Sequence, residues 1–249
     1  MAWQMSSSHD LIPKPTARIP YPPVVVEQER VKKVLKRVFV NWYMMIIMRN
    51  KMTNQKMPNH KEETHKRIVE VAARAIRRTG YSGTGVADIM KEAGLTHGGF
   101  YAHFDSRDAL LAEAGDRAGA ESVALAARVA AAAPPGFALQ AMMQAYLSPE
   151  HIASIETGCP VSALGSEMPR QAPAVRRAAT IHIKEMIDLF ARQLPDWGQP
   201  QAHERAMALV CGLIGTTMVA RAVDDPKLSQ ALCAAALKQF SLVAEPRAD

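Results

Sequence analysis

The stretch Val86–Leu110, VADIMKEAGLTHGGFYAHFDSRDAL, constrains the fold more than any other part of the chain. It opens with four apolar residues at i, i+3, i+4 and i+7, the spacing of one buried helix face: Val86, Ile89, Met90 and Ala93. Gly94 ends this helix, because glycine enters a left-handed turn without a steric penalty. Thr96 can cap a second short helix over residues 97–104. Two short helices joined by such a turn predict a helix-turn-helix, whose second helix enters the major groove of DNA.

The run from Lys66 to Leu111, with GYSGTGVADIMKEAGLTHGGFYAHFDSRDALL at its centre, resembles the DNA-binding domain of TetR-type (tetracycline-repressor family) transcriptional regulators. The matching features occur in order: Gly80 and Tyr81 after the first helix, the Ala93-Gly94 turn, the FYAHF block and the SRDALL start of a long helix. A helical core with packed aromatics would explain the phenylalanines, but not two adjacent glycines at a helix start, which cost about 1 kcal/mol each relative to alanine. The resemblance implies an all-α fold, with an N-terminal three-helix helix-turn-helix domain and a larger helical ligand-binding and dimerisation domain.

The distribution of charge separates the N-terminal part from the rest. Residues 1–56 hold 10 Lys/Arg and 3 Asp/Glu (10 − 3 = +7), whereas residues 57–249 hold 20 and 21 (20 − 21 = −1). The basic excess therefore lies outside the helix-turn-helix, and net charge does not argue for DNA binding. We expect an N-terminal extension over residues 1–56, the DNA-binding domain over 57–112 and the ligand-binding and dimerisation domain over 113–249.

The extension itself allows three interpretations. Residues 1–23 are rich in Ser and Pro and predict disorder, and residues 24–48 form a basic amphipathic run. Its apolar block, residues 38–48, is 11 residues long, against the ~20 that a membrane-spanning helix needs. We favour a translation start at Met52 or Met57, which would leave 193 residues from Met57. An accessory helix and a membrane-surface helix remain open, but we expect no membrane partner.

The resemblance implies eight DNA-contact residues: Lys66, Thr96, His97, Gly98, Gly99, Tyr101, His103 and Arg107. Residues 96–99 would meet base edges, with the glycines allowing close approach of the backbone. The other four would contact phosphate, and His103 should point outward. Family members often carry Lys where His97 stands and a small hydroxyl residue where Gly99 stands, so the operator sequence is not predicted. We also expect the arginines at the end of helix 60–79 to lie on a solvated face: Arg74, Arg77 and Arg78.

The remainder of the chain predicts a helical body. We expect helices over residues 107–133, 137–147, 161–168, 174–194, 201–223 and 227–243, the first of them ended by Pro134-Pro135. Small residues in the last two (Gly212, Gly215, Ala234) permit close helix approach. The resemblance implies that these helices pair with those of a two-fold mate in a four-helix dimer interface. A palindromic operator also needs two heads about one DNA turn (~34 Å) apart. Intrachain core is the alternative.

Seven residues are candidates for lining a small-molecule pocket, although each could equally be core: Met142, Met143, Tyr146, Cys159, Met186, Phe190 and Met218. Cys159, between Gly158 and Pro160 near a helix start, could also be a reactive thiol. The three cysteines lack CxxC spacing, which indicates neither zinc nor disulfides and suits a reducing cytoplasm. No catalytic constellation is recognisable, so we expect no enzyme, cofactor or metal.

Taken with these patterns, the resemblance implies a cytoplasmic, homodimeric repressor that an unknown small-molecule inducer releases from a palindromic double-stranded DNA operator. A helical small-molecule- or electrophile-sensing protein with weak or lost DNA binding is the alternative, and a membrane-tethered regulator using residues 24–48 also stays open.

Overall fold

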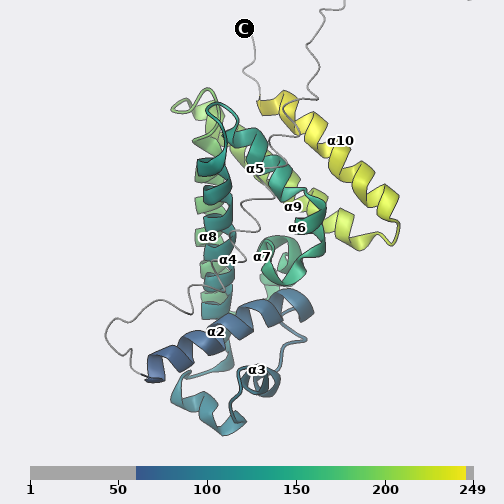
Figure 1. The fold of residues 1–249 in the computed structure, drawn as a ribbon. Helices are drawn as coiled ribbons and strands as arrows, with labels where there is room; N and C mark the ends of the chain where they lie inside the picture. Colours follow the sequence, from purple (N-terminus) through teal and green to yellow (C-terminus); the bar gives the residue numbers. More distant parts are fainter. Residues whose placement is uncertain (1–59, 245–249) are drawn as a thin grey trace, which may run out of the picture.

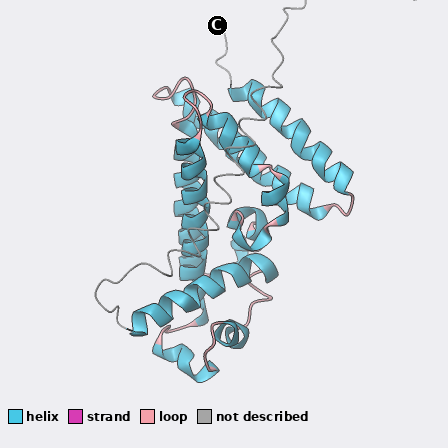
Figure 2. Ribbon diagram, viewed as in Figure 1, coloured by secondary structure: helices cyan, strands magenta, loops and turns pink. Residues whose placement is uncertain are grey.

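The computed structural model describes residues 60–244, and every regular element in that range is helical (Figure 2). The expected all-α fold is therefore confirmed. The predictions made for residues 1–56 lie outside the described residues. The elements in chain order are α2 His60–Thr79, α3 Val86–Glu92, η1 His97–Ala102, α4 Arg107–Ala132, α5 Ala138–Tyr146, α6 Pro149–Ala153, η2 Ile155–Thr157, α7 Pro160–Leu164, η3 Met168–Arg170, α8 Pro173–Ala191, α9 Pro200–Ala222 and α10 Pro226–Ala244.

The N-terminal elements α2, α3 and η1, here called the head, pack on the first turns of α4. Apolar residues of α2 from Ile68 to Ile76 are buried, whereas Thr79 at its end is exposed. Gly80 and Gly94 have φ values of +79° and +72°, the left-handed geometry that favours glycine at helix ends. The elements on either side of these turns are thus fixed by local sequence.

The second helix of the motif differs from the expectation. It is a 3-10 helix that ends at Ala102, and the side chain of Thr96 makes no capping hydrogen bond, although its backbone is extended as an N-cap requires. Gly98 and Gly99 disfavour an α-helix, and 3-10 geometry is common in pieces this short.

The elements α4 to α10, here called the body, surround a second core. Figure 1 shows α4 and α8 side by side, with α2 crossing their lower ends. In the same view α9 and α10 lie to the right of this pair. Gly119 permits this approach of α8 to α4, because a Cβ there would lie 2.3 Å from Cδ2 of His182. Gly212 plays the same part for α10, since its Cβ would lie 2.5 Å from Cζ of Phe240.

Both α4 and α8 run from the head to the far end of the body. Leu110 and Val175, near their starts, belong to the head's core, whereas Val129 and Phe190 belong to the body's core. Leu164 of α7 also lies in the head's core. The head is therefore seated on three elements of the body, and not on α4 alone.

Candidate DNA-binding and ligand sites

The outward face of η1 carries the predicted base-contacting residues. Thr96, His97 and Gly98 are exposed and Gly99 is half-buried, while Tyr101 is 73% exposed. On the opposite face Phe100 and Phe104 are buried with ring centroids 5.6 Å apart. These two rings fix the short helix to the head, so the backbone and side chains of residues 96–101 are presented together to solvent. The direct contacts stay predictions.

His103 does not point fully outward, as the sequence led us to expect. It is half-buried, and its Nδ1 is buried without a hydrogen-bond partner within residues 60–244. Burial lowers the pKa of His103, and the nearby His65 and Lys61 lower it further. The cause is the packing at the end of η1, where the ring of His65 stacks on Phe104 at 4.4 Å and lies 6.1 Å from the ring of His103.

Arg107 and Lys66, predicted to contact phosphate, have intramolecular partners here. The guanidinium of Arg107 donates to the carbonyl of Tyr81 and, over 3.2 Å, to the carbonyl of Thr84, so it ties the loop after α2 to the start of α4. Ser106 caps α4, with its side-chain oxygen accepting from the Ala109 amide at 3.1 Å. Lys66 is exposed, with its Nζ 3.2 Å from Oε1 of Glu62. Their phosphate contacts remain predictions.

The expectation of a solvated arginine face at the end of α2 is wrong for Arg77, whose side chain is fully buried. Its Nη2 donates to Glu121 of α4 over 2.8 Å, and its Nη1 donates to the carbonyl of Gly158 over 3.3 Å. Sequence reasoning missed this residue, although Ala73, one turn earlier on the same side of α2, signals a buried direction. Arg78 is more exposed and bonds Glu92 at 2.9 Å and Glu156 at 3.1 Å.

Six of the seven predicted ligand residues come together in the core of the body: Met142, Met143, Tyr146, Cys159, Met186 and Phe190. The seventh, Met218, is 36% exposed and lies on the outer side of α9. The structure thus separates Met218 from the others. A ligand contact by any of them remains a prediction.

A polar network surrounds Cys159 in this core. His151 is buried, and its Nδ1 donates to the Tyr146 carbonyl over 2.6 Å while its Nε2 accepts from the Cys159 amide over 3.3 Å. These bonds require the neutral ring, and burial, reinforced by the charge of Arg221, lowers the pKa of His151 to about 4. Burial also raises the pKa of Tyr146, and the nearby Cys159 adds to that shift. A reaction at the Cys159 thiol would therefore take place beside the hydrogen bonds of His151.

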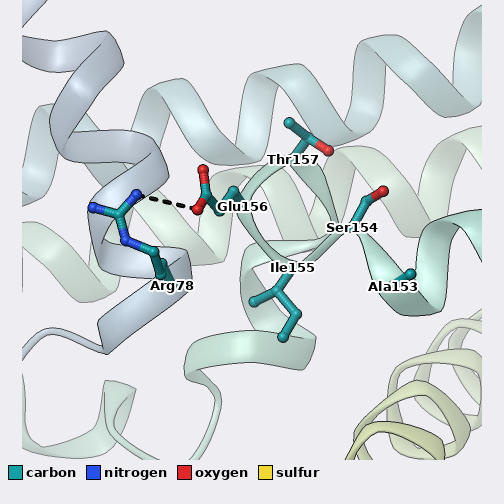
Figure 3. A pocket seen from close by; sticks show the side chains of 6 residues that line it. All are labelled: Arg78, Ala153, Ser154, Ile155, Glu156 and Thr157. Atoms are coloured by element: carbon teal, nitrogen blue, oxygen red, sulfur yellow. Dashed lines mark hydrogen bonds and ion pairs between the residues drawn. The ribbon is translucent and has the colours of Figure 1, made fainter.

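A cleft of about 410 Å³ lies between α2 and η2, lined by Arg78, Ala153, Ser154, Ile155, Glu156 and Thr157. Figure 3 shows the Arg78–Glu156 ion pair at its side, the head contributing the arginine and the body the carboxylate. None of the predicted ligand residues lines this cleft. The cleft lies where head and body meet, so its shape depends on their relative position.

Within residues 60–244 no group of three or more His, Cys, Asp and Glu side chains is placed to hold a metal ion. The cysteines there are free, Cys159 and Cys233 buried and Cys211 exposed. One described helix, α9, is long and apolar enough to cross a membrane by length and composition. Because α9 also packs Leu209, Val210 and Leu213 into the body's core, we interpret it as a core helix.

Comparison with known proteins extends this geometry. Residues 68–114 match the family described as "Bacterial regulatory proteins, tetR family". Residues 135–234 match the family described as "Transcriptional regulator LmrA/YxaF-like, C-terminal domain". None of the curated proteins matches the chain.

The chain is similar in fold to solved structures that it matches over nearly the whole of their length. They include E. coli NemR in its reduced form (18% identity, 75% of this chain and 100% of that chain, TM-score 0.64). A TetR-family regulator from Agrobacterium tumefaciens (21%, 72% and 98%, 0.61) and one from Chloroflexus aurantiacus (24%, 73% and 96%, 0.61) are similar. With a matching helix-turn-helix region, a matching C-terminal domain and the fold of both, this chain belongs to the TetR family of DNA-binding transcriptional regulators.

Proposed function

We propose that this regulator is a homodimeric repressor that binds a palindromic operator through residues 96–103 and leaves it when a small molecule binds the body. The observation that carries the proposal is the face of η1, where Thr96, His97 and Tyr101 are exposed while the phenylalanines behind them are buried. In a helix-turn-helix, the N-terminal residues of the second helix contact base edges in the major groove. A tyrosine hydroxyl can also donate a hydrogen bond to phosphate.

The proposed dimer interface is the outer side of α9 and α10. Exposed apolar side chains gather there in the single chain, with Val219 50%, Leu228 46% and Leu242 60% exposed, and Met207 and Met218 at 40% and 36%. Apolar residues on the side of α9 that faces away from the core support a partner helix. A second copy would cover this side and carry a second head.

The proposed inducer site is the core cluster around Met142, Tyr146 and Phe190, beside the polar network of His151 and Cys159. The cluster packs against α4 and α8, which begin at the head. A ligand that favours one position of these helices by 1–3 kcal/mol would change operator affinity about 5–150-fold. We propose a cytoplasmic location, which suits a DNA-binding protein with free cysteines.

Binding to DNA that flanks the protein's own gene tests the proposal. Fluorescence anisotropy of labelled fragments should show a salt-sensitive, saturable complex, and light scattering should give the mass of two chains. The double variant His97→Ala/Tyr101→Ala should abolish the specific complex, whereas Trp197→Ala, a change of a 53% exposed side chain beyond the end of α8, should not. A monomer with no preference for the flanking DNA over unrelated DNA would refute the proposal.

The polar network favours one alternative, a sensor of electrophiles that acts through Cys159. Because Cys159 is 5% exposed, a reagent could reach it only when the body opens. Selective labelling of Cys159 that changes the protein's response, and that Cys159→Ser abolishes, would support this alternative. An unchanged response in Cys159→Ser would leave the non-covalent inducer.

A further inference from the structure

Residues 151–162, between α5 and α8, are held from two sides by arginines that come from distant parts of the chain. Arg77 belongs to α2 in the head, and Arg221 belongs to the last turn of α9 in the body. The two helices contribute these cations to the same short segment. Figure 3 views the segment from the cleft side, where Arg78 of α2 reaches Glu156.

Arg221 uses all three of its donor positions on this segment. Its Nε donates to the Ile152 carbonyl over 3.0 Å, and its Nη2 donates to the His151 carbonyl over 2.7 Å. Its Nη1 donates to Oγ of Ser162 over 3.0 Å, and that hydroxyl donates to the Cys159 carbonyl over 2.9 Å. A planar guanidinium that meets three acceptors in different directions fixes their positions relative to α9.

Gly158 is the point at which the two arginines meet the same residue. Its carbonyl accepts from Nη1 of Arg77 over 3.3 Å. A Cβ at this position would lie 2.7 Å from Nη2 of Arg221 and 2.9 Å from the carbonyl oxygen of Ser154. The guanidinium of Arg221 therefore packs directly on the backbone that Arg77 binds, and a shift of α9 at Arg221 moves the acceptor of Arg77.

We infer that Arg77 and Arg221 are positioning residues that couple α9, through Gly158, to α2 and so set the orientation of the head. The inference rests on the proposed operator binding and adds a polar route to the covalent one through α4 and to the apolar contacts of α7 and α8. The α4 route enters the head at the start of that helix, at Arg107. The new route ends at Arg77, in the last turn of α2. Contacts at both places restrain rotation of the head about the start of α4.

A double-mutant cycle on operator affinity tests the coupling. Arg77→Met and Arg221→Gln should each weaken binding by about 5-fold or more, the low end of allosteric couplings. The double variant should be little weaker than Arg77→Met alone, because Arg77→Met already breaks the contact through Gly158 that Arg221→Gln disturbs, as well as the ion pair with Glu121. Arg205→Gln is the matched control, since Arg205 pairs with Asp196 near the opposite end of α9, and its effect should add to that of Arg77→Met. Additive effects of Arg77→Met and Arg221→Gln would overturn the inference.

Arg221→Lys separates the geometry from the charge. Lysine keeps the positive charge but cannot bond three separate acceptors with a planar fork, so it should bind operator as weakly as Arg221→Gln. Recovery of wild-type affinity in Arg221→Lys would mean that only charge is needed, and would overturn the inference.

Hydrogen exchange on the full-length protein without DNA tests the same coupling independently of the proposed function. Arg221→Gln should raise exchange in the last turn of α2, including the Gly80 amide that bonds the Ile76 carbonyl, and Arg205→Gln should not. Unchanged exchange in α2 would overturn the coupling even if the wild type binds its operator. If Arg221→Gln raised exchange in α2 but the wild-type protein bound no DNA, the proposed function would be refuted and the coupling would still stand.

Discussion

The ion pair between Arg77 and Glu121 predicts unequal costs for removing its two partners. The side chain of Arg77 is 0% exposed, whereas that of Glu121 is 34% exposed. Glu121 also accepts from Nε of Arg117 over 2.7 Å. Burial alone would raise the pKa of Glu121, but the hydrogen bonds and charges of Arg117 and Arg77 hold it below its usual range. Glu121 therefore keeps a charged partner when Arg77 is lost, while Arg77 loses its carboxylate when Glu121 is lost.

The magnitudes follow from that asymmetry. Glu121→Ala leaves a buried guanidinium whose remaining partner is the Gly158 carbonyl. Breaking a buried pair this way costs about 3–5 kcal/mol in the free energy of unfolding. Arg77→Met replaces the buried charge with an unbranched apolar side chain. It loses the hydrogen bonds to the Gly158 carbonyl and to Glu121, but Glu121 keeps Arg117, so the cost should be about 1–2 kcal/mol. The double variant Arg77→Met/Glu121→Ala should be more stable than Glu121→Ala alone, because no unpaired buried charge remains.

Urea unfolding followed by far-ultraviolet circular dichroism, at one fixed protein concentration, measures these differences. The concentration is held constant because dimerisation changes apparent stability. The slopes of the transitions must stay equal for the midpoints to report stability. The reasoning would be refuted if Arg77→Met cost as much as Glu121→Ala, or if the double variant were the least stable of the three.

Four further outcomes can be measured. Because burial lowers the pKa of His151 from 6.5 to about 4, the unfolded chain binds a proton between those values that the folded protein excludes; the free energy of unfolding should fall by about 3 kcal/mol from pH 6.5 to pH 4, and His151→Gln should remove that part of the slope. Tyr101→Phe should weaken operator binding roughly tenfold through the loss of about 1.5 kcal/mol from a phosphate hydrogen bond, with an unchanged melting temperature because the side chain is 73% exposed; unchanged affinity argues against the contact. Since the pKa of His103 is lowered, any strengthening of operator binding by its protonation should occur only below about pH 6.5. Anisotropy titrations at constant salt measure operator affinity against pH. A change in that affinity above about pH 6.5 in His103→Asn would contradict the prediction. Val219→Lys, at a side chain 50% exposed on α9, should shift light-scattering masses towards the monomer, and an intact dimer would place the interface elsewhere.

The helix order and the turns of the head could be predicted from local sequence, but the burial of Arg77 and of His103 could not. The bounds of α2 and the glycine turns at Gly80 and Gly94 agree with expectation, because each depends on residues within a few positions of one another. The predicted extent of the second helix, residues 97–104, was less accurate, since the structure has His97–Ala102. Gly98 and Gly99 weaken the α-helix locally, so the segment becomes a 3-10 helix that ends at Ala102.

The sequence by itself determined the class of fold, the order of the helices and which face of η1 meets solvent, since helical periodicity and turn chemistry are local properties. Only the tertiary structure decided that Arg77 is buried, that Met218 lies away from the other pocket candidates, and that Arg221 reaches the backbone beside Cys159. These facts depend on which helices cross, and the crossings depend on close approaches such as that of His182 over Gly119. Residues far apart in the chain become partners only once such contacts form, so no local pattern announces them.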